Sequence, residues 1–168
     1  MKKKPVGFLR VAGIVRDSIV DGPGIRLTVF VPGCKIKCPR CHNPETWDFN
    51  GGYVISLDDI LGMYHPQYQG LTLSGGEPFD QDEKQTAALL SLASLIHARG
   101  GDVWAYSGHY LESLRTKNHP LLEAIDALVD GPFAWSLRDL SLKYRNSSNK
   151  RIWIKTPEEA WKNATDKF

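Results

Sequence analysis

Three cysteines within a run of eight residues are the side chains most able to do chemistry in this sequence. Cys34, Cys38 and Cys41 are the only cysteines among the 168 residues, and their spacing is C-x3-C-x2-C. Thiolates spaced so closely can bind one inorganic iron–sulfur cluster. Three thiolates leave one iron of a four-iron cube without a protein ligand, and that iron can bind a substrate or a cofactor. The spacing therefore predicts one 4Fe-4S cluster per chain, with a role in chemistry.

Two other uses of these cysteines fit the sequence less well. A structural zinc site normally has four ligands, and its ligand pairs are usually separated by a longer stretch. The nearby fourth candidate is His42, whose side chain should point away from that of its neighbour Cys41. A disulfide is disfavoured because the number of cysteines is odd and we expect no secretory signal. A small zinc-binding adaptor without turnover is the non-enzymatic alternative.

The composition is typical of a globular protein that binds neither nucleic acid nor membrane. Apolar residues make up 42% of the chain, charged residues 24%, and the net charge is +2. That charge is too small to indicate nucleic-acid binding, and no apolar run approaches the roughly 20 residues of a membrane helix. We expect a cytoplasmic protein with one domain over 1–168. It would have a lead-in at 1–18, a solvated basic start at Lys2 to Lys4, and a tail at 157–168 that forms a marginal helix.

The elements that must position the cysteines alternate between strands and helices. Four segments are predicted as strands: 25–31, 70–73, 102–106 and 127–129. Three segments are predicted as helices: 82–99, 110–115 and 120–126. Strands that alternate with helices usually pair in parallel. The predicted fold class is therefore α/β with a mostly parallel sheet.

Each predicted strand is followed by a loop that could contribute to one site. These loops are the cysteine loop, Gly75-Gly76-Glu77-Pro78, Ser107-Gly108 and Asp130-Gly131. Parallel strands end at the same edge of a sheet, so we expect the loops to meet there. Two glycines let the backbone approach a ligand closely. We therefore expect a branched side chain at Gly76 to collide with the ligand or to force the backbone away, although an ordinary turn before a helix has the same composition.

Together these patterns resemble the radical S-adenosylmethionine (SAM) enzymes. The shared features are the cysteine run after one strand and Gly-Gly-Glu-Pro after a later strand. The segment Asp21–Arg26 is similar to the Gly-Pro-Gly segment of enzymes that activate glycyl-radical proteins. Three later segments are similar to the subgroup that activates the anaerobic (class III) ribonucleoside-triphosphate reductase: Val103–Gly108, Leu128–Phe133 and Tyr144–Asn149. In that subgroup Asn146 is often replaced by glycine.

The resemblance implies a partial (β/α) barrel of the radical SAM type with enzymatic activity. Such an enzyme cleaves SAM reductively at a 4Fe-4S cluster and generates a glycyl radical on the large subunit of the reductase. Flavodoxin or ferredoxin would supply the electrons. An activase of another glycyl-radical enzyme, of the pyruvate formate-lyase type, is the enzymatic alternative, because Cys41-His42-Asn43 is similar to that type.

The resemblance also implies the residues of the site. Cys34, Cys38 and Cys41 would bind the cluster, and the cluster and SAM, rather than a catalytic side chain, would carry the radical chemistry. The implied SAM contacts are Arg40, Cys41, His42, Gly75, Gly76, Glu77 and Ser107. Among these, Glu77 can accept a charge-assisted hydrogen bond from the ammonium group of SAM.

Several further residues have side chains or positions that suggest a role around the site. Lys35, Lys37 and Arg40 could offset the negative charge of a reduced cluster or be ordinary solvated charges. We expect Gly22-Pro23-Gly24 to form a turn near the cluster and Arg26 to form a structural ion pair. Asp130 is expected either to accept a hydrogen bond near the site or to belong to an ordinary turn. The resemblance makes Ser147-Ser148-Asn149 a candidate contact with the partner. Four histidines are expected to be structural or at the surface: His65, His97, His109 and His119.

Overall fold

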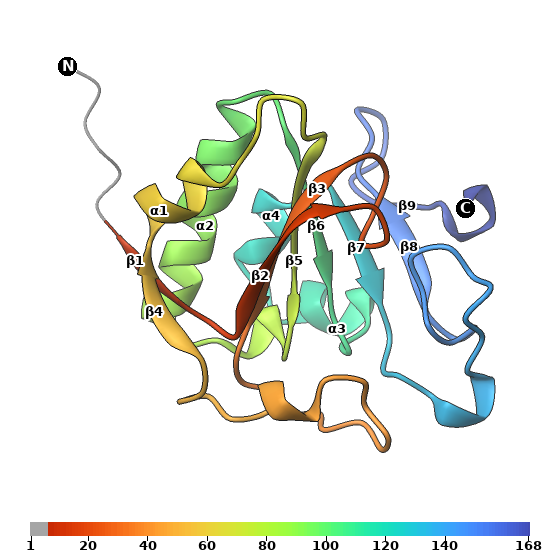
Figure 1. Ribbon diagram of the computed structural model, residues 1–168. Helices are drawn as coiled ribbons and strands as arrows, with labels where there is room; N and C mark the ends of the chain where they lie inside the picture. The colour runs from red at the N-terminus through yellow and green to blue at the C-terminus, as the bar shows by residue number, and fades with distance from the viewer. Residues whose placement is uncertain (1–6) are drawn as a thin grey trace.

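The computed structural model describes residues 7–168, so the basic start at Lys2 to Lys4 lies outside the described residues. A seven-stranded sheet with the order β2-β3-β5-β6-β7-β8-β9 forms its centre (Figure 1). The strands of this sheet are β2 (Gly13–Ser18), β3 (Arg26–Val31), β5 (Gly70–Gly75), β6 (Asp102–Tyr106), β7 (Ala127–Asp130), β8 (Arg151–Ile154) and β9 (Lys162–Asn163). A separate ribbon pairs β1 (Phe8–Val11) with β4 (Tyr53–Ser56). The stretch expected as a lead-in therefore contributes strands to both sheets.

Four central strands give the sheet its parallel character. β3, β5, β6 and β7 pair in parallel, and Val31 at the end of β3 lies opposite Gly75 at the end of β5. The loops that follow these strands therefore leave from the same edge. The edge strands run antiparallel, with β2 against β3 and β8 against β7. The predicted α/β class with a mostly parallel central sheet is confirmed.

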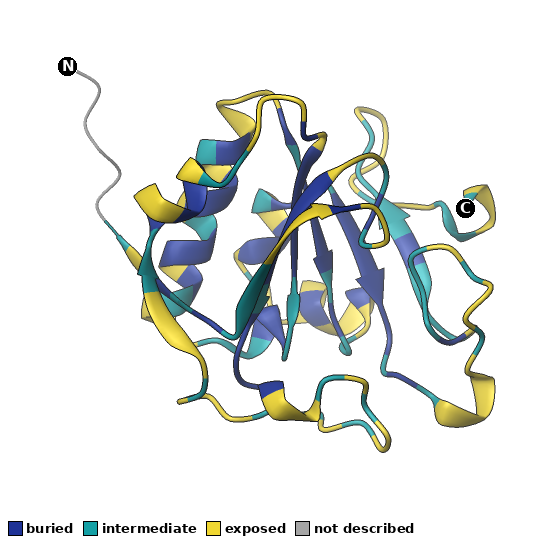
Figure 2. Ribbon diagram, viewed as in Figure 1, coloured by how far each residue is buried: buried dark blue, intermediate teal, exposed yellow. Residues whose placement is uncertain are grey.

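Four helices connect the strands: α1 (Leu57–Gly62), α2 (Glu83–His97), α3 (Leu111–Thr116) and α4 (Leu121–Ala124). The predicted helix at 82–99 is confirmed as α2, which begins where the side chain of Asp82 accepts a hydrogen bond from the Gln85 amide. Its stripe of Leu89, Leu92 and Ile96 is fully buried, as expected for a helix packed on a sheet. Figure 2 shows the buried central strands beside this helix. No helix within residues 7–168 combines the length and apolarity needed to cross a membrane.

The helix predicted for the tail at 157–168 is wrong. This stretch instead contains β9, which pairs with β8, and a 3-10 turn, η4 (Thr165–Lys167). The reason is tertiary: the ring of Phe168 packs at 5.8 Å from Trp104 and 5.5 Å from Tyr144. Contacts with distant aromatic rings outweigh the weak helix preference of so short a segment.

The turn at Gly22-Pro23-Gly24 folds back over the sheet, where the Thr72 hydroxyl donates to the Asp21 carbonyl at 2.8 Å, and its expected place beside the cluster stays a prediction. It comes before the strand begins, and the cysteines come after the strand ends. The buried guanidinium of Arg26 holds this end together: it donates to the Pro23 carbonyl at 3.1 Å and forms an ion pair with Asp102. The expected structural ion pair of Arg26 is confirmed.

Candidate functional site

The cysteine loop is folded back against the end of β3 by backbone hydrogen bonds. The Gly33 amide donates to the Thr46 carbonyl at 2.7 Å, and the Cys34 amide donates to the Trp47 carbonyl at 3.2 Å. Both acceptors lie in or directly after the 3-10 turn η1 (Pro44–Thr46). Between the cysteines, Lys37 and Arg40 have left-handed φ angles of 51° and 58°. These uncommon conformations reverse the chain direction, which directs the three thiols towards one side.

All three thiols line one cavity at the carboxyl edge of the parallel strands. The same cavity is lined by Gly75, Gly76 and Glu77 after β5, and by Ser107 after β6. The meeting of the loops that the sequence predicts is therefore observed. His42 also lines the cavity, whereas Arg40 does not: its exposed guanidinium lies 4.6 Å from the ring centroid of Trp135.

Gly76 is required by the close approach of the backbone around the cysteine loop. A Cβ atom on Gly76 would lie 2.5 Å from the Gly33 carbonyl oxygen and 2.7 Å from that of Thr46. Hydrogen bonds join the same segments, because the Gly76 amide donates to the Val31 carbonyl at 2.8 Å and the Glu77 amide to the Gly33 carbonyl at 2.7 Å. A side chain at Gly76 would therefore collide with the backbone beside Cys34, and its expected effect on a ligand stays a prediction.

Glu77 is a buried carboxylate whose two oxygens are both bonded to protein groups. Its Oε1 accepts from the Ser107 hydroxyl at 2.9 Å and the Phe79 amide at 3.1 Å, and its Oε2 accepts from the Gly108 amide at 2.7 Å. Burial raises the pKa of Glu77 to about 7, because it penalises the charged form more than these hydrogen bonds favour it. The side chain is therefore fixed in position and poised to change its charge near neutral pH.

A second polar pair, not predicted from the sequence, connects the cysteine loop to the turn after β6. His109 Nε2 lies 2.7 Å from Asp80 Oδ1, and Asp80 Oδ2 accepts from the Lys35 amide at 2.9 Å. The hydrogen bond with Asp80 raises the pKa of His109. The pKa of Asp80 is lowered, because the bonds from His109 and Lys35 outweigh the opposing effect of burial. Nothing in the sequence could pair these residues, since they lie 29 positions apart.

Asp130 supports the site from outside the cavity. Its oxygens accept from the Leu111 amide at 2.8 Å and from the guanidinium of Arg151 at 3.0 Å. Of the polar loop at 147–149, Ser147 is buried and its hydroxyl accepts from the Ala134 amide at 3.3 Å. Asn149 donates to the Pro132 carbonyl at 2.7 Å. Asp130 and both of these loop residues therefore hold the chain around the site in place.

The arrangement of the three thiols fits a 4Fe-4S cluster better than a single zinc ion. Within residues 7–168 no group of three or more His, Cys, Asp or Glu side chains is arranged to hold one metal ion. Yet the three free cysteines surround one cavity. A zinc ion needs its ligands at about 2.0–2.3 Å from one point, whereas each thiolate of an iron–sulfur cube binds a different iron. Burial raises the pKa of Cys34, and binding to iron would deprotonate it.

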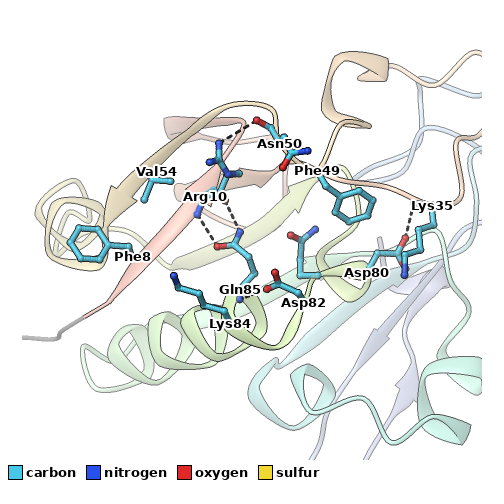
Figure 3. A pocket seen from close by; sticks show the side chains of 11 residues that line it. Phe8, Arg10, Lys35, Phe49, Asn50, Val54, Asp80, Asp82, Lys84 and Gln85 are labelled. Carbon is cyan, nitrogen blue, oxygen red and sulfur yellow. Dashed lines mark hydrogen bonds between the residues drawn. The ribbon is translucent and has the colours of Figure 1, made fainter.

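A larger hollow lies where β1 and β4 meet the start of α2, but it lacks the chemistry of the cavity. Figure 3 shows its lining, in which Arg10 and Gln85 exchange hydrogen bonds of 2.9 and 3.1 Å between side chain and backbone. Phe8 and Phe49 contribute apolar surface, and Lys35 and Lys84 contribute charge. None of the three cysteines lines this hollow. The candidate site is therefore the smaller cavity that the thiols share.

Comparison with known proteins gives the same result. Residues 20–153 match the family model described as a 4Fe-4S single cluster domain. The chain belongs to this 4Fe-4S single cluster domain family. The match covers most of the chain, including all three cysteines, and it supports the expected 4Fe-4S cluster.

Relatives of this 4Fe-4S protein carry the name of the predicted subgroup. The anaerobic ribonucleoside-triphosphate reductase-activating protein of Salmonella typhimurium is 37% identical over 143 residues, which cover 80% of this chain and 92% of the relative. The protein of that name from Escherichia coli K12 gives the same values. The one from Enterobacteria phage T4 is 32% identical over 151 residues, 86% of this chain and 93% of the relative. The resemblance to reductase-activating proteins is confirmed.

Proposed function

We propose that this protein is a radical SAM enzyme that activates the anaerobic ribonucleoside-triphosphate reductase by generating a glycyl radical on its large subunit. The observation that carries the proposal is the shared cavity, where three thiols face the Gly-Gly-Glu turn at the carboxyl edge of parallel strands. Such edges bind ligands in α/β proteins. The family match and the names of the relatives support the iron–sulfur and activating roles.

Cys34, Cys38 and Cys41 would hold the cluster, and the turns after β5 and β6 would hold SAM. When bound, the cluster and SAM supply an electron and a 5′-deoxyadenosyl radical, so the protein needs no catalytic side chain of its own. Glu77, fixed by Ser107 and the Gly108 amide, would attract the ammonium group of SAM. Backbone groups of Cys41 and His42, which both line the cavity, would contact the adenine.

The four parallel strands and their helices would form a partial barrel of the radical SAM type. A second hollow shares His42, Ser74 and Tyr106 with the cavity and reaches Ile19 and Leu140. It is open to solvent, and a loop of the reductase would enter through it. Hydrogen abstraction needs the glycine close to the radical carbon, which docking of that loop would achieve. Flavodoxin or ferredoxin in a reducing cytoplasm would supply the electron.

Anaerobic reconstitution tests this function. We expect about four irons per chain, slow release of 5′-deoxyadenosine with SAM and dithionite, and a glycine-centred doublet in the electron paramagnetic resonance spectrum once the reductase is added. A reductase variant with alanine at the radical glycine is the control and should give no doublet. Efficient SAM cleavage without a radical on any authentic reductase would overturn the proposed partner. A colourless protein that binds zinc alone would overturn the enzyme.

A further inference from the structure

One cation lies in the wall of the cysteine cavity, where no anionic side chain pairs with it. Lys150 lines this cavity together with all three cysteines, and its side chain is partly buried. None of the ion pairs found among residues 7–168 includes it. A partly buried ammonium group without an anionic partner is costly. Glu77 lines the same cavity without forming an ion pair with Lys150, so the position favours a further negative charge inside the cavity.

The fold aims Lys150 at the cavity. The residue directly precedes β8, whose first residue, Arg151, forms ion pairs with Asp130 and Glu112. Glu112 belongs to α3, so the side chain of Arg151 lies on the face that this helix covers. Neighbouring side chains of an extended chain point to opposite faces, which directs Lys150 to the other face. Hydrogen bonds fix its backbone: its amide donates to the Ser147 carbonyl at 3.2 Å, and Arg145 donates to its carbonyl at 3.1 Å.

The acidic groups around Lys150 are thiols and carboxyl groups of the cavity and its wall. Burial lowers the pKa of its ammonium group, and the opposing influences come first from Cys38 and then from Glu77, Asp130 and Cys41. By contrast, the cations of the cysteine loop, Lys35, Lys37 and Arg40, are all exposed. Water and salt screen exposed charges, whereas a partly buried charge is screened less.

We propose that Lys150 is the counter-charge of the cluster: its ammonium group faces the three thiolates and makes the cluster easier to reduce. This inference rests on the proposed ligation by Cys34, Cys38 and Cys41. One electron from a low-potential donor adds one negative charge to a group that is already anionic, and no atom is transferred. A fixed positive charge nearby stabilises the reduced form more than the oxidised form. The sequence suggested that the loop cations offset the charge of the reduced cluster. In this proposal Lys150, more than one hundred positions away, does so instead.

A redox titration of the reconstituted protein without SAM tests the proposal. In Lys150→Met, at a fixed applied potential, the ratio of reduced to oxidised cluster should fall about tenfold, which equals a shift of about 59 mV to more negative potential for one electron. Lys150→Arg should keep the ratio within about threefold of wild type, because it keeps the charge. Lys37→Met, which removes an exposed cation from the cysteine loop, should change the ratio far less than Lys150→Met. Equal effects of Lys150→Met and Lys37→Met would overturn the proposal.

Chemical labelling of the wild-type protein gives a test that does not depend on how a variant folds. Acetylation followed by peptide mass spectrometry should modify Lys150 in the cluster-free protein and spare it in the loaded protein. Lys35 and Lys37 should react in both. Equal labelling of Lys150 in both forms would overturn the proposal. So would a Lys150→Met variant with normal reduction and weakened SAM binding, since Lys150 would then serve the carboxylate of SAM. Failure of the wild-type protein to bind iron would instead overturn the proposed function.

Discussion

The hydroxyl of Ser107 donates a 2.9 Å hydrogen bond to Oε1 of Glu77, which joins the turn after β6 to the turn after β5. The same hydroxyl accepts from the His109 amide at 2.9 Å. Ser107 therefore has its proton committed to Glu77 and one acceptor site committed to the backbone. In the proposed function, Ser107 would therefore act on SAM mainly by holding the Glu77 carboxylate in place.

The burial of Glu77 predicts that the cluster-free protein loses stability as the pH rises through the weakly acidic range. Its pKa of about 7 in the folded protein exceeds its ordinary value of 4.5. The folded state thus holds a proton that the unfolded chain releases, so stability should fall between about pH 4.5 and pH 7 and level off above. The difference corresponds to at most about 3 kcal/mol.

Urea unfolding of wild type and Glu77→Gln between pH 5 and 8 measures this effect. The raised pKa of His109 acts in the same direction, so the difference between the two proteins is the informative quantity. The Glu77→Gln variant should show a flatter dependence on pH. Curves that run parallel over this range would contradict the prediction.

The pair of His109 and Asp80 should stabilise both the fold and the loaded cluster, because it ties the turn after β6 to the cysteine loop. His109→Asn should lower the free energy of unfolding by about 1–3 kcal/mol, the usual value for a charge-assisted hydrogen bond. The loss should be greatest below the raised pKa of His109 and above the lowered pKa of Asp80, where both groups are charged. A double-mutant cycle with Asp80→Asn measures the coupling; strictly additive effects would show that the pair contributes nothing.

Gly76→Ala should impair folding and cluster loading rather than SAM affinity alone. The added Cβ would meet the carbonyl oxygens of Gly33 and Thr46, which belong to backbone and cannot move away cheaply. We expect a loss of about 1–3 kcal/mol in stability, as for other overpacked sites. Gly13→Ala is the matched control, since nothing lies within 4 Å of its Cβ position. Thermal melts and iron content check the result, and a stable Gly76→Ala protein with full iron would be incompatible with this packing.

Replacement of any one of Cys34, Cys38 and Cys41 by alanine should abolish stable cluster binding and SAM cleavage. The sequence contains no other cysteine that could substitute. Iron and sulfide analysis after anaerobic reconstitution, with 5′-deoxyadenosine release as the second readout, measures the loss. A single variant that keeps about four irons per chain and near wild-type cleavage would remove that cysteine from the ligand set.

The central strands and the shared site could be predicted because their signals are local. Apolar runs that end in glycine or in the cysteine loop mark the parallel strands, and parallel strands bring the following loops to one edge. The position of Lys150 could not be predicted, since it depends on the pairing of β8 with β7 across the polar loop at 147–149. The helix prediction for the tail failed for a similar reason, because the contacts of Phe168 with Trp104 and Tyr144 are invisible to local sequence patterns.

The backbone bonds around Gly33 and Gly76 also limit how this site could be transplanted. The Gly33 amide is bonded to Thr46, the Glu77 amide is bonded to Gly33, and the Gly76 amide is bonded to Val31. Grafting the cysteine run alone into another sheet would leave its thiols without the turn that sets their position. The smallest portable unit runs from β3 to the 3-10 turn η2 (Pro78–Asp80) that follows Glu77. To move the proposed cluster relative to SAM, a protein engineer would have to redesign the cysteine loop and the turn after β5 together.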